Sequence, residues 1–298
     1  MKFLLTAINA KFIHSNPAIY SLRAGVGEKL QPYVELAEFT INESLESILE
    51  GIWKRQPKVI GFSCYIWNWK LIREILTELP KILPDTEIWL GGPEVTYDGP
   101  GLLSEFPQVT GIMVGEGEVT FREVLGQYVR EAESTGQSEQ QPEPDSIEQQ
   151  AADRTGTLAG KSVAERFGQI PGLCLASGYT APRELTDLTT LPFLYEDMEP
   201  FTNRIIYYET SRGCPYRCSY CLSSIDKKVR LRDIDVVKRE LQFFLDQNVK
   251  QVKFIDRTFN CDHKHAMEIW EYIYKHDNGV TNFHFEISAD ILREEEIV

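Results

Sequence analysis

The sequence of 298 residues lacks long apolar runs and lacks the spacing of a disulfide-stapled protein. No stretch reaches the roughly 18 apolar residues of a membrane-spanning helix. The start, MKFLLTAINAKF, has a strand's length and an early Asn rather than the apolar core of a signal peptide. Of the six cysteines, three lie within eight residues and the others are single, which indicates metal binding in a reducing compartment. These features predict a cytoplasmic protein with no membrane span.

Basic residues are also scarce. Lys and Arg number 31 against 45 Asp and Glu, which gives a formal net charge of -14. Binding to a nucleic acid backbone needs a clustered excess of Lys and Arg, so nucleic acid is excluded as the main partner.

The first part of the chain alternates strand-like and helix-like segments, as in a parallel sheet covered on both faces. The expected strands are 2–9, 33–40, 58–64, 87–91 and 110–115. Apolar residues between them recur at helical spacing, as in Leu45, Ile48, Leu49 and Ile52. We therefore predict an α/β domain over residues 1–131 with a five-stranded, doubly wound sheet of the Rossmann or flavodoxin type. In such sheets ligands bind beyond the carboxyl ends of the strands.

An acidic low-complexity stretch separates this domain from the rest. Between Glu131 and Asp153 there are seven acidic residues and no Lys or Arg, and bulky apolar side chains are almost missing. Such a composition cannot offset the entropy of ordering, so residues 132–165 are predicted to be a disordered insertion. Residues 166–204 are expected to form a hairpin and a connecting strap.

A second alternating unit is expected over residues 205–298. Its strands are 205–210, 250–256 and 282–287, and its helices are 233–247 and 263–275. A complete parallel barrel takes roughly 200 or more residues, about twice what this segment offers. We therefore expect the first part of a (β/α) barrel of the TIM type, truncated at the carboxyl terminus.

Three cysteines follow the first strand of this unit in the sequence TSRGCPYRCSYC. Cys214, Cys218 and Cys221 have the spacing CxxxCxxC, and three thiolates can bind three irons of a cubane while the fourth iron stays open. A zinc site would need a fourth ligand, for which only Cys261, His263 and His265 are near in sequence. A ferredoxin site would need a fourth nearby cysteine, which this loop does not have. These three cysteines are the predicted catalytic and metal-binding residues.

At these residues the chain resembles the radical S-adenosylmethionine (radical SAM) superfamily. The resemblance implies a 4Fe-4S cluster whose open iron chelates S-adenosylmethionine and whose electron cleaves it to a deoxyadenosyl radical. It also implies that Tyr220, just before the last cysteine, lies against the adenine. Asp256, Glu286 and Ser288 follow the second and third strands and are expected to reach the cofactor's polar groups.

Three loops of the first domain follow strands and carry glycines: SCYIWN, GGPEVTYD and GEGEVTF. A nicotinamide dinucleotide would need a glycine-rich turn after the first strand, but NAKFIHSNP contains no Gly. Ahead of a CxxxCxxC barrel, these loops resemble the cobalamin-binding domain of cobalamin-dependent radical SAM enzymes. The resemblance implies cobalamin contacts from loop residues, which are Ser63, Tyr65, Gly91, Gly92, Pro93, Gly115, Glu116, Gly117 and Glu118.

His14 is the only histidine in residues 1–131 and lies in the loop after the first strand. It is a candidate cobalt ligand, although a lone loop histidine is more often a hydrogen-bonding side chain. The DxHxxG loop of mutase-type cobalamin domains, which supplies an imidazole to cobalt, is missing.

With both cofactors, the expected reaction is methyl transfer to an unactivated carbon of an unknown small-molecule or peptide substrate. The radical chemistry belongs to the cofactors, and the protein places them and excludes water. A low-potential electron donor of the flavodoxin or ferredoxin type is the expected partner. Two alternatives remain open: a radical cyclase or oxidative rearrangement of the anaerobic tetrapyrrole cyclase type, and a non-catalytic cobalamin carrier or sensor with a structural cluster.

Overall fold

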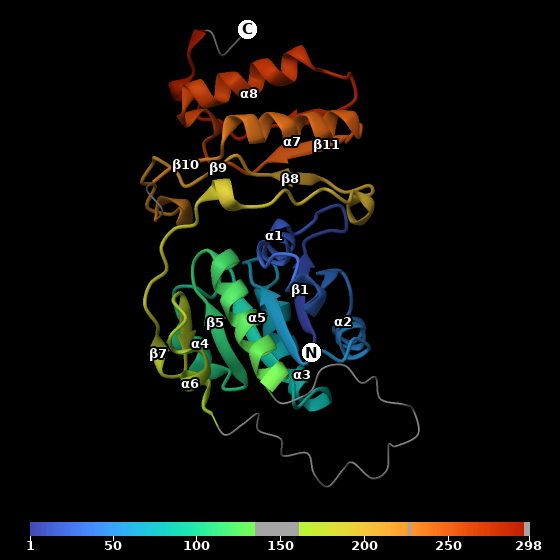
Figure 1. The fold of residues 1–298 in the computed structure, drawn as a ribbon, viewed down its shortest axis with the longest axis vertical. Coiled ribbons are helices and arrows are strands. Elements are labelled where there is room, and N and C mark those ends of the chain that lie inside the picture. Colours follow the sequence, from blue (N-terminus) through green and yellow to red (C-terminus); the bar gives the residue numbers. More distant parts are fainter. Residues whose placement is uncertain (135–160, 226–227, 295–298) are drawn as a thin grey trace. The chain divides into compact units, whose positions relative to one another are not determined.

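The computed structural model describes residues 1–134, 161–225 and 228–294, which divide into two compact units (Figure 1). The first unit contains Met1–Ala10 and Ala18–Leu185, and the second contains Lys11–Pro17 and Thr186–Val298. The loop after the first strand therefore belongs to the second unit, although the sequence suggested that it is part of the first domain. The expected insertion at 132–165 lies mostly outside the described residues.

The first unit is built on one sheet with the strand order β2-β1-β3-β4-β5-β6-β7. The strands are β1 (Phe3–Asn9), β2 (Val34–Thr40), β3 (Val59–Ser63), β4 (Glu87–Gly91), β5 (Val109–Met113), β6 (Leu173–Leu175) and β7 (Gly178–Tyr179). The first five are parallel and confirm the predicted doubly wound sheet. The expected hairpin, β6–β7, is antiparallel to β5 and extends the same sheet.

Helices cover both faces of this sheet because each parallel strand is apolar on both sides. The helices are α1 (Pro17–Gly25), α2 (Leu45–Trp53), α3 (Trp69–Ile82), α4 (Gly99–Glu105), α5 (Gly117–Ser134) and α6 (Val163–Phe167). One core joins Leu4 and Ile8 of β1 to apolar residues of α2, α3 and α4. The other joins Phe3 and Leu5 of the same strand to α1, α5 and α6. Every residue of β1 is buried, because β2 and β3 flank it and helices cover both of its faces.

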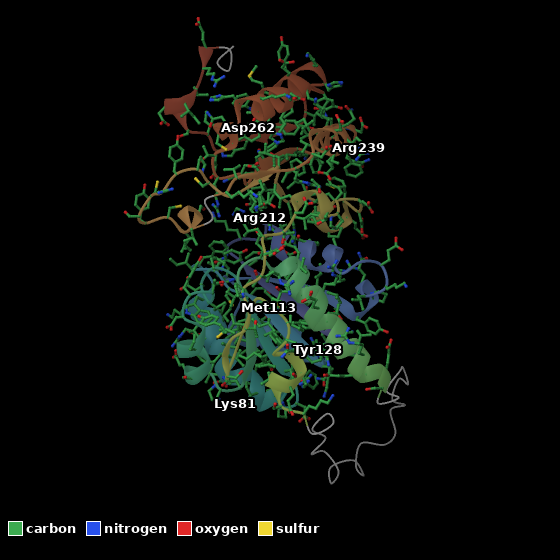
Figure 2. The ribbon with its side chains drawn as sticks, turned by 60° about the vertical axis from the view of Figure 1, so that its left-hand side comes forward. Lys81, Met113, Tyr128, Arg212, Arg239 and Asp262 are labelled. Carbon is green, nitrogen blue, oxygen red and sulfur yellow. The ribbon has the colours of Figure 1, made fainter. Side chains whose placement is uncertain are left out.

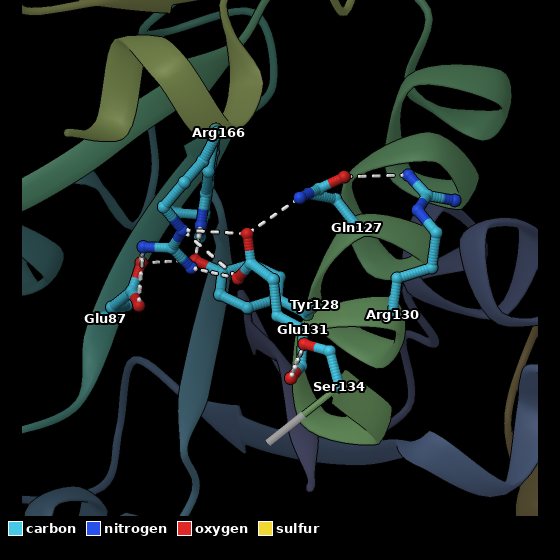
Figure 3. A network of polar contacts seen from close by, with 8 residues as sticks. Glu87, Gln127, Tyr128, Arg130, Glu131, Ser134 and Arg166 are labelled. Atoms are coloured by element: carbon cyan, nitrogen blue, oxygen red, sulfur yellow. Dashed lines mark hydrogen bonds and ion pairs between the residues drawn. The ribbon is translucent and has the colours of Figure 1, made fainter. Parts of the chain in front are cut away.

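A buried arginine fastens α6 to α5 and β4 (Figure 3). The guanidinium of Arg166 lies 3.0 Å from carboxylate oxygens of both Glu87 and Glu131, and its side chain is 8% exposed. The hydroxyl of Tyr128 donates to Glu87 at 2.5 Å and accepts from the indole of Trp89 at 2.8 Å. Arg166 lies shortly after residue 161, where the described residues resume beyond α5. The network therefore holds the segment that leads into the β6–β7 hairpin against the sheet.

The second unit contains a three-stranded parallel sheet with the order β12-β11-β8. Its strands are β8 (Ile206–Tyr208), β11 (Gln251–Phe254) and β12 (Asn282–His284), and its helices are α7 (Ile234–Asp246) and α8 (His263–Lys275). A short antiparallel pair, β9 (Ser211–Arg212) and β10 (Arg230–Leu231), follows β8. The βαβαβ order agrees with the parallel strand–helix unit expected over residues 205–298. Within the described residues, no helix of either unit has the length and apolar character that a membrane crossing requires.

Aromatic side chains on one face of this small sheet pack against the helices. Tyr208 meets Phe244 of α7 with ring centroids 5.4 Å apart, and Phe254 meets Phe259 at 5.2 Å. The hydroxyl of Tyr208 also donates to Glu240 of α7 at 2.5 Å. Asp262, labelled in Figure 2, caps α8 by accepting from the backbone N–H of His265 at 2.9 Å. The second unit thus has its own core, which holds β8 in place.

Candidate functional site

The cysteine loop leaves β9 through a turn that only glycine can make without strain. Gly213 has φ +102°, and a Cβ at this position would lie 2.4 Å from the carbonyl oxygen of Lys228. L-residues avoid this backbone region, and the contact leaves no room for a methyl group. The turn brings the residues after β9 beside those before β10. It therefore sets the position of Cys214, the first cysteine of the motif.

Asp256 ties the start of this loop to the end of β11. Its carboxylate accepts hydrogen bonds from the Thr210 backbone N–H at 3.1 Å, the Thr210 hydroxyl at 2.7 Å and the Ser211 hydroxyl at 2.6 Å. The side chain is buried, and this burial raises the pKa of Asp256 to about 6 in spite of the three hydrogen bonds. In this structure Asp256, predicted to contact the cofactor, positions the loop that carries the cysteines.

The three cysteines differ in exposure. Cys214 is buried, with its Sγ 3.5 Å from the hydroxyl of Thr258, whereas Cys218 is exposed and Cys221 is partly exposed. The backbone N–H of Cys221 donates to the carbonyl of Cys218 at 3.1 Å, which makes a tight turn between them. In the described part of the chain, no three Cys, His, Asp or Glu side chains converge as ligands of a single ion. The ligands of a cubane bind separate irons, so a cluster does not require such convergence.

The alternative zinc ligands lie on α8 and just before it. Cys261 is partly exposed and His265 is buried, and burial lowers the pKa of His265 and raises that of Cys261. Neither forms a converging ligand set with the motif cysteines among the described residues. The donor set of the loop, three thiols, fits an iron-sulfur cluster with one open position.

The other residues predicted to contact S-adenosylmethionine are spread around this loop. Tyr220 is 91% exposed, so its ring is available to a ligand. Glu286 forms an ion pair with Lys253, with 3.2 Å between Oε1 and Nζ. The hydroxyl of Ser288 donates to Asp290 at 2.6 Å, and its backbone pairs with the side chain of Asn260.

In the first unit, the loops after β3 and β4 are joined by their backbones. The N–H of Cys64 donates to the carbonyl of Gly91 at 2.7 Å, and a Cβ on Gly92 would lie 2.4 Å from the carbonyl oxygen of Cys64. Asn68, fully buried, braces the β3 loop by donating to the carbonyls of Ile8 and Ser63 at 3.0 and 2.9 Å. Gly92 therefore serves the packing of two loops, and Pro93 beside it is exposed.

The glycines of the β5 loop leave different amounts of space. A Cβ on Gly115, which has φ +77°, would meet no atom within 4 Å, whereas one on Gly117 would lie 3.0 Å from Leu22. Gly117 begins α5, and Glu118 is buried beside Ser21 of α1, whose hydroxyl is 3.4 Å from its Oε1. Glu116 is partly exposed. Of these loop glycines, Gly115 is the one at which a ligand has open space.

Aromatic side chains of the β3 loop are accessible. Tyr65 and Trp67 stack with ring centroids 4.4 Å apart and an interplanar angle of 8°. Trp67 is 47% exposed and Ile66, between them, is 81% exposed. This edge of the first unit presents apolar surface next to the braced loop, as a binding site for a large planar ligand requires.

His14 is held by the first strand of the second unit. Its Nδ1 is hydrogen-bonded to the hydroxyl of Tyr207, and its backbone forms a parallel bridge with Ile205. Burial, followed by the nearby charges of Lys11 and Lys253, lowers the pKa of His14. One ring nitrogen is therefore engaged within the second unit.

Comparison with known families matches both units. The B12 binding domain matches residues 4–125, and the Radical SAM superfamily matches residues 208–298. The chain pairs a B12-binding domain with a radical SAM domain. Both predicted resemblances are thereby confirmed.

Curated relatives match this chain over part of their length. The 2-(S-pantetheinyl)-carbapenam-3-carboxylate methyltransferase of Streptantibioticus cattleyicolor is 27% identical over 228 residues, which cover 73% of this chain and 29% of that protein. The anaerobic magnesium-protoporphyrin IX monomethyl ester cyclase of Rubrivivax gelatinosus is 24% identical over 269 residues, covering 86% and 43%. The chain thus spans less than half the length of these relatives.

A solved structure supports the fold. The cobalamin-dependent S-adenosylmethionine radical enzyme OxsB, with aqua-cobalamin and S-adenosylmethionine bound, matches with a TM-score of 0.68 and 17% identity. The match covers 99% of this chain and 40% of that one. At this identity the likeness supports the fold of the two domains and leaves the substrate open.

Several residues of the radical SAM domain were not predicted from the sequence. Thr210 and Ser211 hold Asp256, and Thr258 contacts the first cysteine. The available signal was position: Thr210 and Ser211 follow the first barrel strand, and Thr258 follows the second, where ligand-facing loops lie. In the B12-binding domain, Asn68 was missed because its brace depends on β1, which is distant in sequence.

Proposed function

We propose that this chain provides the cobalamin- and S-adenosylmethionine-binding domains of a radical enzyme that methylates an unactivated carbon. The observation that carries the proposal is the CxxxCxxC loop directly after the first strand of a parallel βαβαβ unit, behind a B12-binding domain. A methyltransferase among the curated relatives supports this reaction.

Cys214, Cys218 and Cys221 would hold three irons of a 4Fe-4S cluster, which leaves one iron for S-adenosylmethionine. When bound, these groups would supply the radical that activates the substrate, and cobalamin would supply the methyl group. The protein's part is positioning: Gly213 sets the turn and Asp256 fixes the loop against β11. Tyr220, with its exposed ring, would lie against the adenine, and Glu286 and Ser288 would reach polar groups of the same ligand.

In the B12-binding domain, the loops after β3, β4 and β5 would hold the corrin and its nucleotide tail. Gly115 leaves open space for the tail, and α5 starts two residues later with its backbone N–H groups unshared by the helix. The stacked Tyr65 and Trp67 offer a planar apolar surface. The remaining proposed contacts from these loops are Ser63, Gly91, Gly92, Pro93, Glu116, Gly117 and Glu118. His14, the candidate cobalt ligand of the sequence, belongs to the second unit and is not part of this proposed corrin site.

Anaerobic reconstitution with iron, sulfide and cobalamin tests the cluster assignment. Iron analysis and ultraviolet-visible spectra are expected to show one cluster and one corrin per chain. Cys218→Ala is expected to lose the cluster and reductive cleavage of S-adenosylmethionine. Cys261→Ala removes a cysteine outside the motif and is expected to keep both; loss of the cluster in this control would mean a fourth protein ligand and no open iron.

The reaction itself is tested with methyl-labelled S-adenosylmethionine and a low-potential donor of the flavodoxin or ferredoxin type, the proposed electron source. Label in the product supports methylation. A ring-forming product without label would favour the cyclase alternative, which the Rubrivivax gelatinosus relative keeps open. A protein that binds cobalamin and a cluster but never cleaves S-adenosylmethionine would instead be a carrier or sensor.

A further inference from the structure

Thr258 lies in the loop that follows β11, and its hydroxyl contacts the first cysteine of the motif. Its Oγ1 is 3.5 Å from the Sγ of Cys214, and both residues are buried. Among the described residues, this sulfur is the one hydrogen-bond partner of the Thr258 hydroxyl. Cys218 is exposed and Cys221 is partly exposed, so Cys214 is the motif cysteine with buried surroundings.

The loop after β11 holds this hydroxyl in place. The backbone N–H of Cys261 donates to the carbonyl of Thr258 at 3.0 Å, which closes a tight turn. The side chain of Asn260, fully buried, donates to the carbonyl of Ser288 at 3.0 Å and accepts from its backbone N–H at 2.9 Å. These bonds fasten the loop to the segment that follows β12, so Thr258 approaches Cys214 from a rigid support.

The direction of the hydrogen bond follows from the state of the sulfur. Between a thiol and a hydroxyl, either group can donate. A cysteine that binds a metal is a thiolate without a proton, so its sulfur can only accept. The hydroxyl of Thr258 then has to donate to Cys214, and burial strengthens this bond because the surroundings have a low dielectric constant.

A donor at a ligand sulfur acts on the reduction potential of an iron-sulfur cluster. Reduction adds one electron and forms or breaks no other bond, so the sulfurs carry more negative charge in the reduced state. A hydrogen bond to one of them therefore stabilises the reduced state more than the oxidised state. The contact from Thr258 would make the cluster easier to reduce.

We propose that Thr258 is a positioning residue whose hydroxyl donates to the Cys214 thiolate and raises the reduction potential of the cluster. The electron comes from the low-potential donor of the flavodoxin or ferredoxin type. The inference rests on the proposed function, since it needs Cys214 as a cluster ligand. Thr258 itself touches neither the irons nor the substrate in this assignment and acts through the cysteine.

A redox titration of the reconstituted full chain tests the proposal without turnover. The reduced cluster is followed by electron paramagnetic resonance, with no S-adenosylmethionine added. Thr258→Val replaces the hydroxyl with a methyl group. At a fixed applied potential, we expect it to lower the ratio of reduced to oxidised cluster at least threefold, which is about 28 mV for one electron. Thr258→Ser keeps a hydroxyl and is expected to keep the wild-type potential.

Thr281→Val is the matched control. It makes the same change at another buried threonine, whose hydroxyl accepts from the side chain of Asn278 at 3.0 Å. Thr281 directly precedes β12, at the end of the parallel sheet opposite to the cysteine loop. It is expected to keep the wild-type potential.

Three results would overturn the proposal: an unchanged potential in Thr258→Val, an equal decrease in Thr258→Ser, or an equal decrease in Thr281→Val. If Thr258→Val bound no iron, Thr258→Ala would give the same comparison, because it removes the hydroxyl without directing a methyl group at the sulfur. A wild-type chain that binds no cluster would refute the proposed function as well. A full cluster with equal potentials would refute this inference alone.

Discussion

Gly213 stands directly before the first cysteine and sets the path of the loop. Replacing it with Ala adds a methyl group 2.4 Å from the carbonyl oxygen of Lys228, on top of the strain of φ +102°. We expect Gly213→Ala to destabilise the protein by more than the roughly 1–3 kcal/mol of a strained backbone and to lower the iron bound after reconstitution. Urea unfolding and iron analysis measure both effects.

Gly279→Ala is the matched control, because Gly279 also has a positive φ, +67°, but no atom lies within 4 Å of its added Cβ. It is expected to cost about 1–2 kcal/mol and to keep the full iron content. An equal loss of bound iron in Gly213→Ala and Gly279→Ala would contradict this prediction. It would mean that a strained backbone at either position lowers cluster binding, so that the turn at Gly213 has no special role.

Asp256 makes a second prediction at the residue scale. Its pKa rises from 3.8 to about 6 on folding, so the folded state binds the proton more tightly than the unfolded state. Stability is therefore expected to fall as pH rises from about 4 to about 6, by at most about 3 kcal/mol, since a tenfold change in proton affinity is worth about 1.4 kcal/mol. Urea unfolding of the cluster-free protein between about pH 4 and about pH 6 measures the slope of the free energy of unfolding against pH.

In Asp256→Asn this contribution to the slope is expected to vanish. Asp246→Asn removes an exposed carboxylate of α7 and is expected to keep the wild-type slope. Other titrating groups act equally in all three proteins, so the difference between the variants isolates Asp256. An unchanged slope in Asp256→Asn would contradict the assignment of the buried carboxyl.

At the scale of elements, Arg166 fastens α6 to β4 and α5. Removal of its guanidinium leaves Glu87 and Glu131 close together and poorly exposed, at 21% and 19%. We expect Arg166→Met, which keeps the apolar stem, to lower the free energy of unfolding by about 2–4 kcal/mol. Arg73→Met breaks the exposed pair with Glu105 and is expected to cost less than about 1 kcal/mol. Urea unfolding measures the free energy of unfolding of both variants. An equal loss in Arg166→Met and Arg73→Met would contradict the role of Arg166 as a buried ion-pair partner.

The strands and long helices were predictable because their apolar periodicity is local. The expected strand 87–91 and helix 263–275 match β4 and α8 in full. The attachment of β6 to β5 was not predictable, because Cys174 pairs with Ile112 across the low-complexity stretch. Four expected strands end two or more residues early: 110–115 ends at Met113, before the open turn at Gly115, and 205–210, 250–256 and 282–287 end at Tyr208, Phe254 and His284.

At the scale of the whole molecule, the division into two α/β units was predictable from the order of segments, and the spacing of Cys214, Cys218 and Cys221 predicts the cluster ligands that we propose. The placement of Lys11–Pro17 in the second unit was not, because it depends on contacts of His14 and Ser15 with residues about 190 positions away. The support around the site was equally hidden, because the hydrogen bond from Thr210 to the buried carboxylate of Asp256 joins residues 46 positions apart.

This division predicts that the two cofactors load independently. Gly115→Ala places a methyl group in open space in the B12-binding domain, so only a ligand at that position would meet it. Gly178→Ala is the matched control, since Gly178 has φ +111° and equally open surroundings at the start of β7. We expect Gly115→Ala to weaken cobalamin binding at least tenfold, measured by the corrin spectrum in equilibrium dialysis, while Gly178→Ala binds normally. Both should keep the full cluster, and Cys218→Ala should keep cobalamin. If Cys218→Ala lost cobalamin together with the cluster, the two binding sites would be coupled. That result would contradict the assignment of one cofactor to each unit.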